Sequence, residues 1–277
     1  MSDQRITRRD LVIGGAAAVV MMGCSSDGEA TSATSTSAAE SGGESDTNRG
    51  SQGTVSTTSP TSTEPQACVL SPELTAGPYH LDGHLMRSDI TEDRSGTPVE
   101  FRVKVIALPE CTPLAGAAVD IWHCDANGEY SGFNGNSLEA TQTQGTNEHT
   151  FLRGVQLTGA DGEAVFKTIF PGWYEGRTVH IHLKVLEGGT PARTYSGGHV
   201  AHVGQAFFDE QLTAQLLKTE PYSGHTGSRT TNDEDSIYRQ AGASAITKMT
   251  ASETGQYVGE FTVMVDPAAT PEPAPLF

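Results

Sequence analysis

The segment EAVFKTIFPGWYEGRTVHIHLKVL, residues 163–186, contains two apolar runs separated by a Pro-Gly pair. Both runs are rich in β-branched and aromatic residues, so the segment predicts two strands joined by a turn. In the second run His180 and His182 are two residues apart and therefore project from the same face of the strand. Ile181 and its apolar neighbours project from the other face. The segment thus predicts a strand with one apolar face and one face that carries two imidazoles.

Similar short runs occur on the N-terminal side of this segment. Turns rich in Gly, Pro, Asp and Asn separate them, as in PECTPLAG (109–116) and CDANGEYSG (124–132). The strand-like runs are VEFRVKVIAL (99–108) and AAVDIWHC (117–124). Many short strands with closely spaced turns favour an all-β fold, a β-sandwich with few short helices. One helix is expected in FDEQLTAQLLKTEP (208–221). We expect the folded domain to span residues 67–265, followed by a Pro-rich tail at 266–277.

The N-terminal quarter has a different composition. Arg8 and Arg9 precede an apolar run that ends at Gly23, so residues 1–23 resemble a twin-arginine (Tat) signal peptide. Cys24 directly follows and resembles a lipid-attachment cysteine, although ordinary cleavage nearby is the alternative. Residues 24–66 are rich in Ser, Thr and Gly and predict a disordered linker. The chain is therefore expected to be exported, as an extracellular protein or as a cell-surface lipoprotein with a membrane tether.

Charge and cysteine content narrow the function classes. The formal net charge is -17, which argues against nucleic-acid binding because that needs a basic face. The four cysteines, Cys24, Cys68, Cys111 and Cys124, include no CxxC pair, so a zinc ribbon is not indicated. Cys111 and Cys124 lie at opposite ends of one extended stretch, too far apart to bridge. Cys68 could pair with either of them.

Two tyrosines near the predicted strand ends suggest the identity of a metal. Tyr174 follows the Pro-Gly turn, six residues before His180, and Tyr130 follows the turn after the strand 117–124. A phenol has a pKa near 10, and a nearby metal cation favours the phenolate. Phenolate is a hard donor that suits Fe(III) better than Zn(II). Two tyrosines with His180 and His182 therefore predict a ferric site with a free position for water or substrate.

Residues 67 to about 265 resemble the intradiol ring-cleavage dioxygenases, the family of catechol and protocatechuate dioxygenases. The segments that carry the resemblance are GPYHLDG, PLAGAAVDIWHCDANGEYSG, FLRGVQLT, TIFPGWYEGRTVHIHLKV and GQAFF. The resemblance implies an oxidoreductase that opens catechols between the two hydroxyl-bearing carbons, using O2 and giving muconate-type products. It implies a non-haem Fe(III) cofactor held by four residues, Tyr130, Tyr174, His180 and His182.

The resemblance also implies roles for residues around the iron. Tyr174 would leave the iron as it takes up a proton from the substrate, and Arg177 would stabilise negative charge on the ring. Gln205 and Tyr79 would lie beside the substrate. We expect a small aromatic diol without a strong requirement for a carboxylate, because no second dedicated arginine stands out. The sequence gives neither the individual catechol nor the oligomeric state.

Each of these residues also has a purely structural interpretation. Tyr130 could pack on Trp122, and Arg177 could form an ion pair with Glu175 or Asp125. His199 and His202 could combine with the two strand histidines in a copper or zinc site. The rival function is a non-catalytic, transthyretin-like binding or spacer module on the cell surface. Such modules share a Pro-Gly turn followed by Tyr, but they lack the HxH strand, the preceding arginine and a second exposed tyrosine.

Overall fold

The computed structural model describes residues 68–135, 145–272 and 274–275. The predictions for the signal peptide, for Cys24 and for the linker fall on residues outside these ranges. Within the described residues, no helix is long and apolar enough to cross a membrane.

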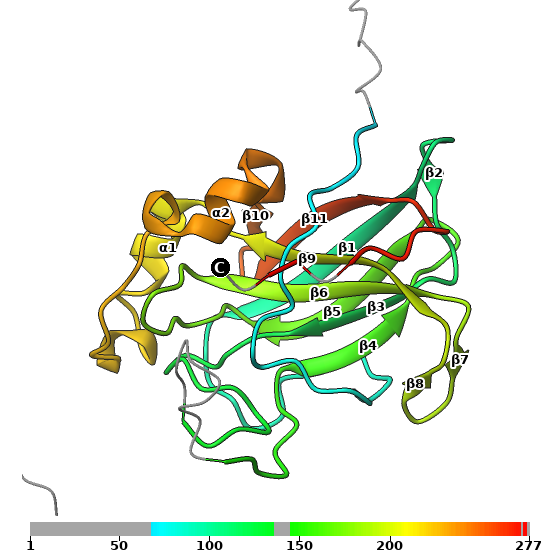
Figure 1. Ribbon diagram of the computed structural model, residues 1–277. Coiled ribbons are helices and arrows are strands. Elements are labelled where there is room, and N and C mark those ends of the chain that lie inside the picture. Colours follow the sequence, from blue (N-terminus) through cyan, green and yellow to red (C-terminus); the bar gives the residue numbers. More distant parts are fainter. Residues whose placement is uncertain (1–67, 136–144, 273, 276–277) are drawn as a thin grey trace, which may run out of the picture. The chain divides into compact units, whose positions relative to one another are not determined.

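The described chain is built mainly from strands (Figure 1). The strands are β1 Pro98–Ala107, β2 Thr112–Pro113, β3 Ala118–Trp122, β4 Arg153–Leu157, β5 Glu163–Ile169, β6 His180–Glu187, β7 Thr190–Pro191, β8 Tyr195–Ser196, β9 His199–Phe207, β10 Lys248–Ala251 and β11 Tyr257–Val265. The helices are α1 Glu210–Leu216 and α2 Ser236–Ala241, with single 3-10 turns at Tyr222–Gly224, Asn232–Glu234 and Ala243–Ala245.

Two sheets form the sandwich, which confirms the predicted all-β class (Figure 1). One sheet has the order β10-β11-β1-β2, and β5 also pairs with β1. The other has the order β4-β3-β6-β9 and is antiparallel throughout. Within the first sheet β1 and β11 run parallel. The hairpin of β7 and β8 forms a separate small ribbon.

The core lies between the inner faces of these sheets. Along β1 every second side chain is buried, so that Phe101 and Val103 point inward. They belong to the same apolar cluster as Ile121 of β3 and Leu183 of β6. This alternation is what a strand with one buried face requires. In β3 and β6, the residues between those that enter the core project from the opposite face of the four-stranded sheet.

That other face of the four-stranded sheet carries a row of polar and aromatic side chains. Trp122 of β3 pairs with His182 of β6, which in turn pairs with Gln205 of β9. Opposite residues of neighbouring strands share a face, so these three side chains lie side by side. The chain before β1 crosses this sheet and is tied to it by backbone bonds, such as Leu74 N to Val203 O at 2.9 Å. The row is therefore covered rather than open to solvent.

The helix expected within residues 208–221 is α1. Asp209 caps it by accepting a hydrogen bond from the Leu212 N–H at 2.8 Å, as a side-chain oxygen at an N-cap commonly does. The second helix, α2, was not anticipated from the sequence. It is short and depends on the Asp235 carboxylate, which accepts from the first-turn N–H groups of Ile237 and Tyr238.

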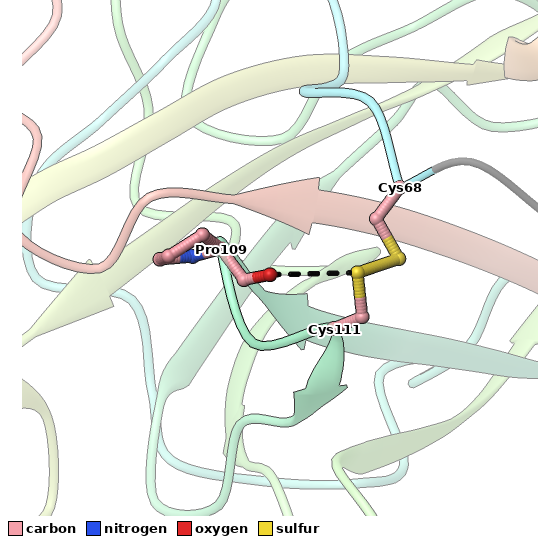
Figure 2. Close-up of a disulfide and its surroundings, with 3 residues drawn as sticks. All are labelled: Cys68, Pro109 and Cys111. Atoms are coloured by element: carbon pink, nitrogen blue, oxygen red, sulfur yellow. Dashed lines mark hydrogen bonds between the residues drawn. A yellow bond between two sulfur atoms is a disulfide. The ribbon is translucent and has the colours of Figure 1, made fainter.

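A disulfide joins Cys68 to Cys111, one of the two pairings left open by the sequence (Figure 2). The Cys111 sulfur lies 3.7 Å from the carbonyl oxygen of Pro109. Cys124 is a buried free thiol. The bridge ties the first described residue to the loop between β1 and β2, 43 residues away in the sequence.

Replacing Cys68 and Cys111 together by Ser should lower the free energy of unfolding by about 3–4 kcal/mol, because the unfolded chain regains the freedom of a long loop. Urea unfolding followed by fluorescence measures this change. A reducing agent should destabilise the parent protein by a similar amount and leave the double variant unaffected. Equal sensitivity of both proteins to the reductant would contradict the pairing.

His123, which directly follows β3, makes two buried hydrogen bonds. Its Nδ1–H donates to the Cys124 carbonyl at 2.8 Å, and its Nε2 accepts from the Thr168 hydroxyl at 2.7 Å. Burial lowers the pKa of His123 to about 4, despite the favourable carbonyl of Cys124. Since the unfolded imidazole has a pKa near 6.5, the unfolded state binds more protons between these two values. The stabilisation is complete above pH 6.5 and is lost as the pH falls toward 4.

Lowering the pH from 7 to 5 should therefore cost the parent protein about 2 kcal/mol more unfolding free energy than it costs a His123→Gln variant. Urea unfolding of both iron-free proteins at the two pH values measures the difference. His149→Gln is the matched control, because His149 is exposed. If His123→Gln and the parent lost equal stability, His123 would not be the group responsible.

Candidate metal centre

The first strand residues of β6 bring two imidazoles together. His180 and His182 are 2% and 0% exposed, and their Nε2 atoms are 2.9 Å apart. The Nδ1–H of His180 donates to the Thr178 carbonyl at 2.6 Å. This bond leaves a lone pair on Nε2 of His180, as in metal-ligating histidines whose other nitrogen is hydrogen-bonded.

Tyr174 reaches the same place from the turn before β6. The Arg177 N–H donates to the Tyr174 carbonyl at 3.3 Å, which closes the turn. Gly172 packs against the backbone at Asp125 and Ala126, where a Cβ would come within 2.4 Å of the Asp125 carbonyl oxygen. Only glycine permits that approach, which presses this turn against the loop that follows β3.

Tyr130 is delivered by that second loop. The Asp125 carboxylate accepts hydrogen bonds from the N–H groups of Asn127 at 2.9 Å and Glu129 at 3.0 Å. The Asp125 N–H donates back to the Glu129 carbonyl at 2.9 Å. Short-range bonds from an aspartate side chain stabilise such turns. The turn directs Tyr130 inward, where its side chain is 1% exposed.

The four predicted ligand side chains thus form one buried ring cluster. The ring centroids of Tyr130 and Tyr174 are 5.6 Å apart, and those of His180 and His182 are 4.5 Å apart. Tyr174 lies 5.8 Å from His180, and Tyr130 lies 6.1 Å from His182. Both phenol hydroxyls are buried and lie close enough to interact with each other, but neither has a partner of hydrogen-bond geometry within the part of the chain that the structure describes. An unpaired buried hydroxyl is costly, so a further partner for both is expected.

The protonation states suit metal ligation. Burial, reinforced by the Arg177 charge, lowers the pKa of His180 to about 3. Burial and the neighbouring His180 hold the pKa of His182 well below 6.5. Burial raises the pKa of Tyr174 to about 12 and that of Tyr130 well above 10. The imidazoles are therefore neutral donors at pH 7, whereas the phenols become phenolates only beside an added cation.

These observations fit a hard trivalent ion. The Nε2 atoms of the two imidazoles lie 2.9 Å apart, so both nitrogens face one small space in which they would hold the same ion. Two phenols and two imidazoles are a donor set suited to Fe(III). The same ion would give both phenol oxygens the bonding partner that they lack.

Two further aromatic side chains hold this cluster in place. The ring of Trp122 stacks on that of His182, with centroids 5.0 Å apart and planes 3° from parallel. Tyr79, which is fully buried, stacks on Tyr130 at 4.4 Å. Tyr130 thus stacks on Tyr79. Trp122, which the sequence suggested as a packing partner of Tyr130, stacks on His182. Gly77 lies so close to His182 that an added Cβ would be 3.0 Å from its Cε1.

Arg177 and Gln205 reach the cluster as predicted. The guanidinium of Arg177 donates from Nη2 to the Gln205 amide oxygen at 2.5 Å and lies 3.4 Å from His180 Nε2 through Nη1. The ion pair considered from the sequence, with Glu175 or Asp125, is not the observed one. Arg177 Nε instead donates to Asp235 at 2.8 Å. The correct partner lies far along the chain, so sequence proximity could not reveal it.

The competing histidine site is not assembled. His199 pairs with Glu187 and His202 with Val185 along β9 and β6, further from the start of β6 than His180 and His182. His202 bonds the Glu73 carboxylate at 2.5 Å, and His199 bonds the Pro267 carbonyl at 2.9 Å. Each has its own hydrogen-bond partner, so they do not join the two strand imidazoles.

A second group of metal-ligand type lies on the same sheet face, namely His80, His84 and Asp120. Two histidines and a carboxylate also hold Fe(II) in some oxygenases. Here Lys184 lies 3.4 Å from His80, and Arg153 lies 3.4 Å from His84. Both cations can only donate, so each imidazole accepts from a cation and donates to Asp120. The polar atoms of this network are thus hydrogen-bonded to one another and to two cations, whereas the hydroxyls of Tyr130 and Tyr174 have no such partner, which makes the network the poorer candidate for iron.

Comparison with known proteins identifies the family. A protein-family model described as "Dioxygenase" matches residues 70–220. The intradiol ring-cleavage dioxygenase from Tetranychus urticae has a similar structure, with a TM-score of 0.66 and 32% identity over 74% of this chain and 98% of that one. This chain belongs to the intradiol ring-cleavage dioxygenase family.

Two other relatives extend the comparison for this family member. The dioxygenase domain of a carbohydrate-binding fusion protein from Streptomyces sp. SirexAA-E matches with a TM-score of 0.50 and 25% identity, covering 72% of this chain and 100% of that domain. Catechol 1,2-dioxygenase 1 of Acinetobacter lwoffii is 30% identical over 158 residues, 54% of this chain. This match spans 45% of the length of the Acinetobacter protein.

Replacing Gly77 by Ala should disturb the predicted iron site of this family member without unfolding the domain. The backbone at Gly77 has φ +72°, and the new methyl group would press on His182. We expect the variant to retain less iron than the parent after identical loading, measured by metal analysis. Gly83→Ala is the matched control, because Gly83 has a similar φ of +77° but no atom within 4 Å of the added Cβ. Equal iron loss in both variants would assign the effect to backbone strain alone.

Proposed function

We propose that this chain is a non-haem ferric dioxygenase that cleaves catechols between the two hydroxyl-bearing carbons and releases muconate-type products. Family membership supports a ring-cleaving oxidoreductase. The observation that carries the finer proposal is the pair of unpartnered phenol hydroxyls beside two facing imidazole nitrogens. We assign Tyr130, Tyr174, His180 and His182 as the iron ligands.

When bound, the ferric ion would supply a Lewis acid and electron acceptor that activates a chelated catechol toward O2. The protein must then accept the protons that the diol loses on chelation. Tyr174 is suited to this task because its pKa, raised to about 12 by burial without a metal, makes its phenolate a strong base. The phenolate oxygen that Tyr174 would have beside the cation can take up one substrate proton and so return to the neutral phenol.

Arg177 provides positive charge beside the same site. Its guanidinium is 4% exposed and keeps its charge, because Tyr174 and Asp235 offset the burial that alone would lower its pKa. A fixed cation in a site from which water is excluded stabilises negative charge more strongly than one in solvent. Gln205, held by Arg177 and by the Thr75 carbonyl at 2.8 Å, supports the guanidinium from the β9 side.

The surrounding side chains limit the substrate class. Arg153, the second buried arginine of the described residues, donates to the carbonyl and hydroxyl oxygens of Ser131. It is therefore already engaged and is a poor candidate for binding a substrate carboxylate. We propose simple catechols without a required carboxylate as substrates. Oxygen uptake with catechol, hydroxyquinol and protocatechuate tests this proposal, and strict dependence on protocatechuate would contradict it.

The iron-loaded protein should be coloured, because phenolate-to-iron charge transfer absorbs visible light, and catechol should shift that band.

Tyr174→Phe should keep part of the iron yet lose at least about 100-fold in turnover, the usual contribution of a positioned proton acceptor. His180→Ala should lose the metal. Tyr257→Phe, on the distant β11, is the matched control and should behave as the parent.

A colourless protein that takes up no iron after reconstitution would favour the non-catalytic, transthyretin-like module instead. Full ring-cleavage activity in both Tyr174→Phe and His180→Ala would show that the ligand assignment is wrong. Metal analysis and oxygen uptake on the same preparations separate these two results.

Export by the Tat route and lipid attachment at Cys24 are part of the proposal. Their support is the twin arginine at Arg8 and Arg9 and the position of Cys24 after the apolar run. Cell fractionation tests both points. Replacing the two arginines by Lys should block export, and Cys24→Ala should release the exported protein from the membrane.

A further inference from the structure

Asp235 is a buried carboxylate with unusually many donors around it. Its side chain is 1% exposed. One oxygen accepts from Arg177 Nε at 2.8 Å and from the Thr178 N–H at 2.9 Å. The other accepts from the N–H groups of Ile237 at 2.8 Å and Tyr238 at 3.2 Å. Asp235 therefore links the start of α2 to the turn that leads into the proposed iron ligands.

The contacts of Arg177 show what this link does. Its Nε is held by Asp235, and its Nη2 is held by the Gln205 amide oxygen. The remaining nitrogen, Nη1, lies 3.4 Å from Nε2 of His180, the atom assigned as an iron ligand. A planar guanidinium fixed at two of its three nitrogens can present the third in only one direction. The two clamps thus direct Nη1 toward the proposed iron site.

The charges reinforce this geometry. Burial alone would raise the pKa of Asp235, but the Arg177 charge and the Thr178 N–H outweigh it, so the pKa lies below its usual value. Asp235 is consequently an anion at neutral pH, and the buried cation of Arg177 has a matched counter-charge. A buried charge without such a partner shifts its position or draws in water.

We propose that Asp235 is a positioning residue for ring cleavage, which clamps Arg177 so that Nη1 faces the reacting ring. This inference rests on the proposed function, because it gives Arg177 its role there. Asp235 touches neither the proposed ligands nor the substrate site through its own side chain. Its carboxylate also accepts from the Thr178 N–H, whose residue holds His180 through its carbonyl, so the Arg177→Gln background is needed to isolate the contribution made through Arg177.

Three substitutions separate the clamp from the helix cap. Asp235→Ser retains a side-chain oxygen that can cap α2, but it removes the charge and the reach to Arg177. Asp235→Glu keeps the charge and moves it by one methylene, so it should restore part of the function. Asp209→Ser is the matched control, because Asp209 caps α1 in the same way but is exposed and bonds no arginine.

Asp235→Ser should lower kcat by about 10- to 100-fold, the usual cost of losing a supporting partner. Iron content and the resting visible band should be unchanged, as should activity in Asp209→Ser. In an Arg177→Gln background the same change should alter kcat by less than about threefold, because residues that act as one unit are not additive. An equal loss in both backgrounds would overturn the proposal, as would an equal loss in Asp209→Ser.

A second readout needs neither iron nor turnover. In the iron-free protein, the Arg177 Nε–H should exchange with solvent at least about tenfold faster in Asp235→Ser than in the parent, measured by nitrogen-15 NMR. Unchanged exchange would overturn the clamp. If the iron-loaded parent consumed no O2 with any catechol, the proposed function would fail, whereas this exchange measurement would still decide whether Asp235 holds Arg177.

Discussion

The pairing register of three strands is the constraint on which the rest of this structure depends. Trp122, His182 and Gln205 face one another across β3, β6 and β9. A slip of one residue in β6 would turn both histidines into the apolar core and would expose Ile181 and Leu183 on the polar face. The alternation of apolar residues in β1 and β6 disfavours that slip. The slipped register would bury the two imidazoles among side chains that offer no hydrogen bond.

The proposed centre carries a cost in folding free energy when no ion is bound. Two phenol hydroxyls are buried without partners, and each such group costs about 1–3 kcal/mol. The imidazoles are held neutral by burial, which removes the charge that solvent would stabilise. The sandwich core and the segment that covers the sheet offset this cost. A cluster of unsatisfied donors inside a well-packed domain is typical of a site shaped for a bound group.

Local sequence predicted the residues of this cluster because their spacing reflects strand and turn geometry. The HxH pattern placed two imidazoles on one face, and the turns after Pro171 and Asp125 placed the tyrosines near strand ends. The sequence reduced the possible disulfide partners of Cys68 to Cys111 and Cys124, but it did not decide between them. The Asp235 partner of Arg177 and the contact of Gly77 with His182 were missed. Both join segments that are distant in sequence, and neither has a local pattern.

The amino-acid sequence by itself determined the all-β class, the apolar and polar faces of β6 and the types of the candidate ligands, because periodicity and side-chain chemistry are local properties. Only the tertiary structure showed how the hydrogen bonding of the two candidate metal-binding groups differs. Asp120 and its two histidines are already hydrogen-bonded beside Lys184 and Arg153, whereas the tyrosine hydroxyls of the other group are not. That difference depends on which donors and charges the folded chain brings within bonding distance, and residue spacing along the chain does not encode it.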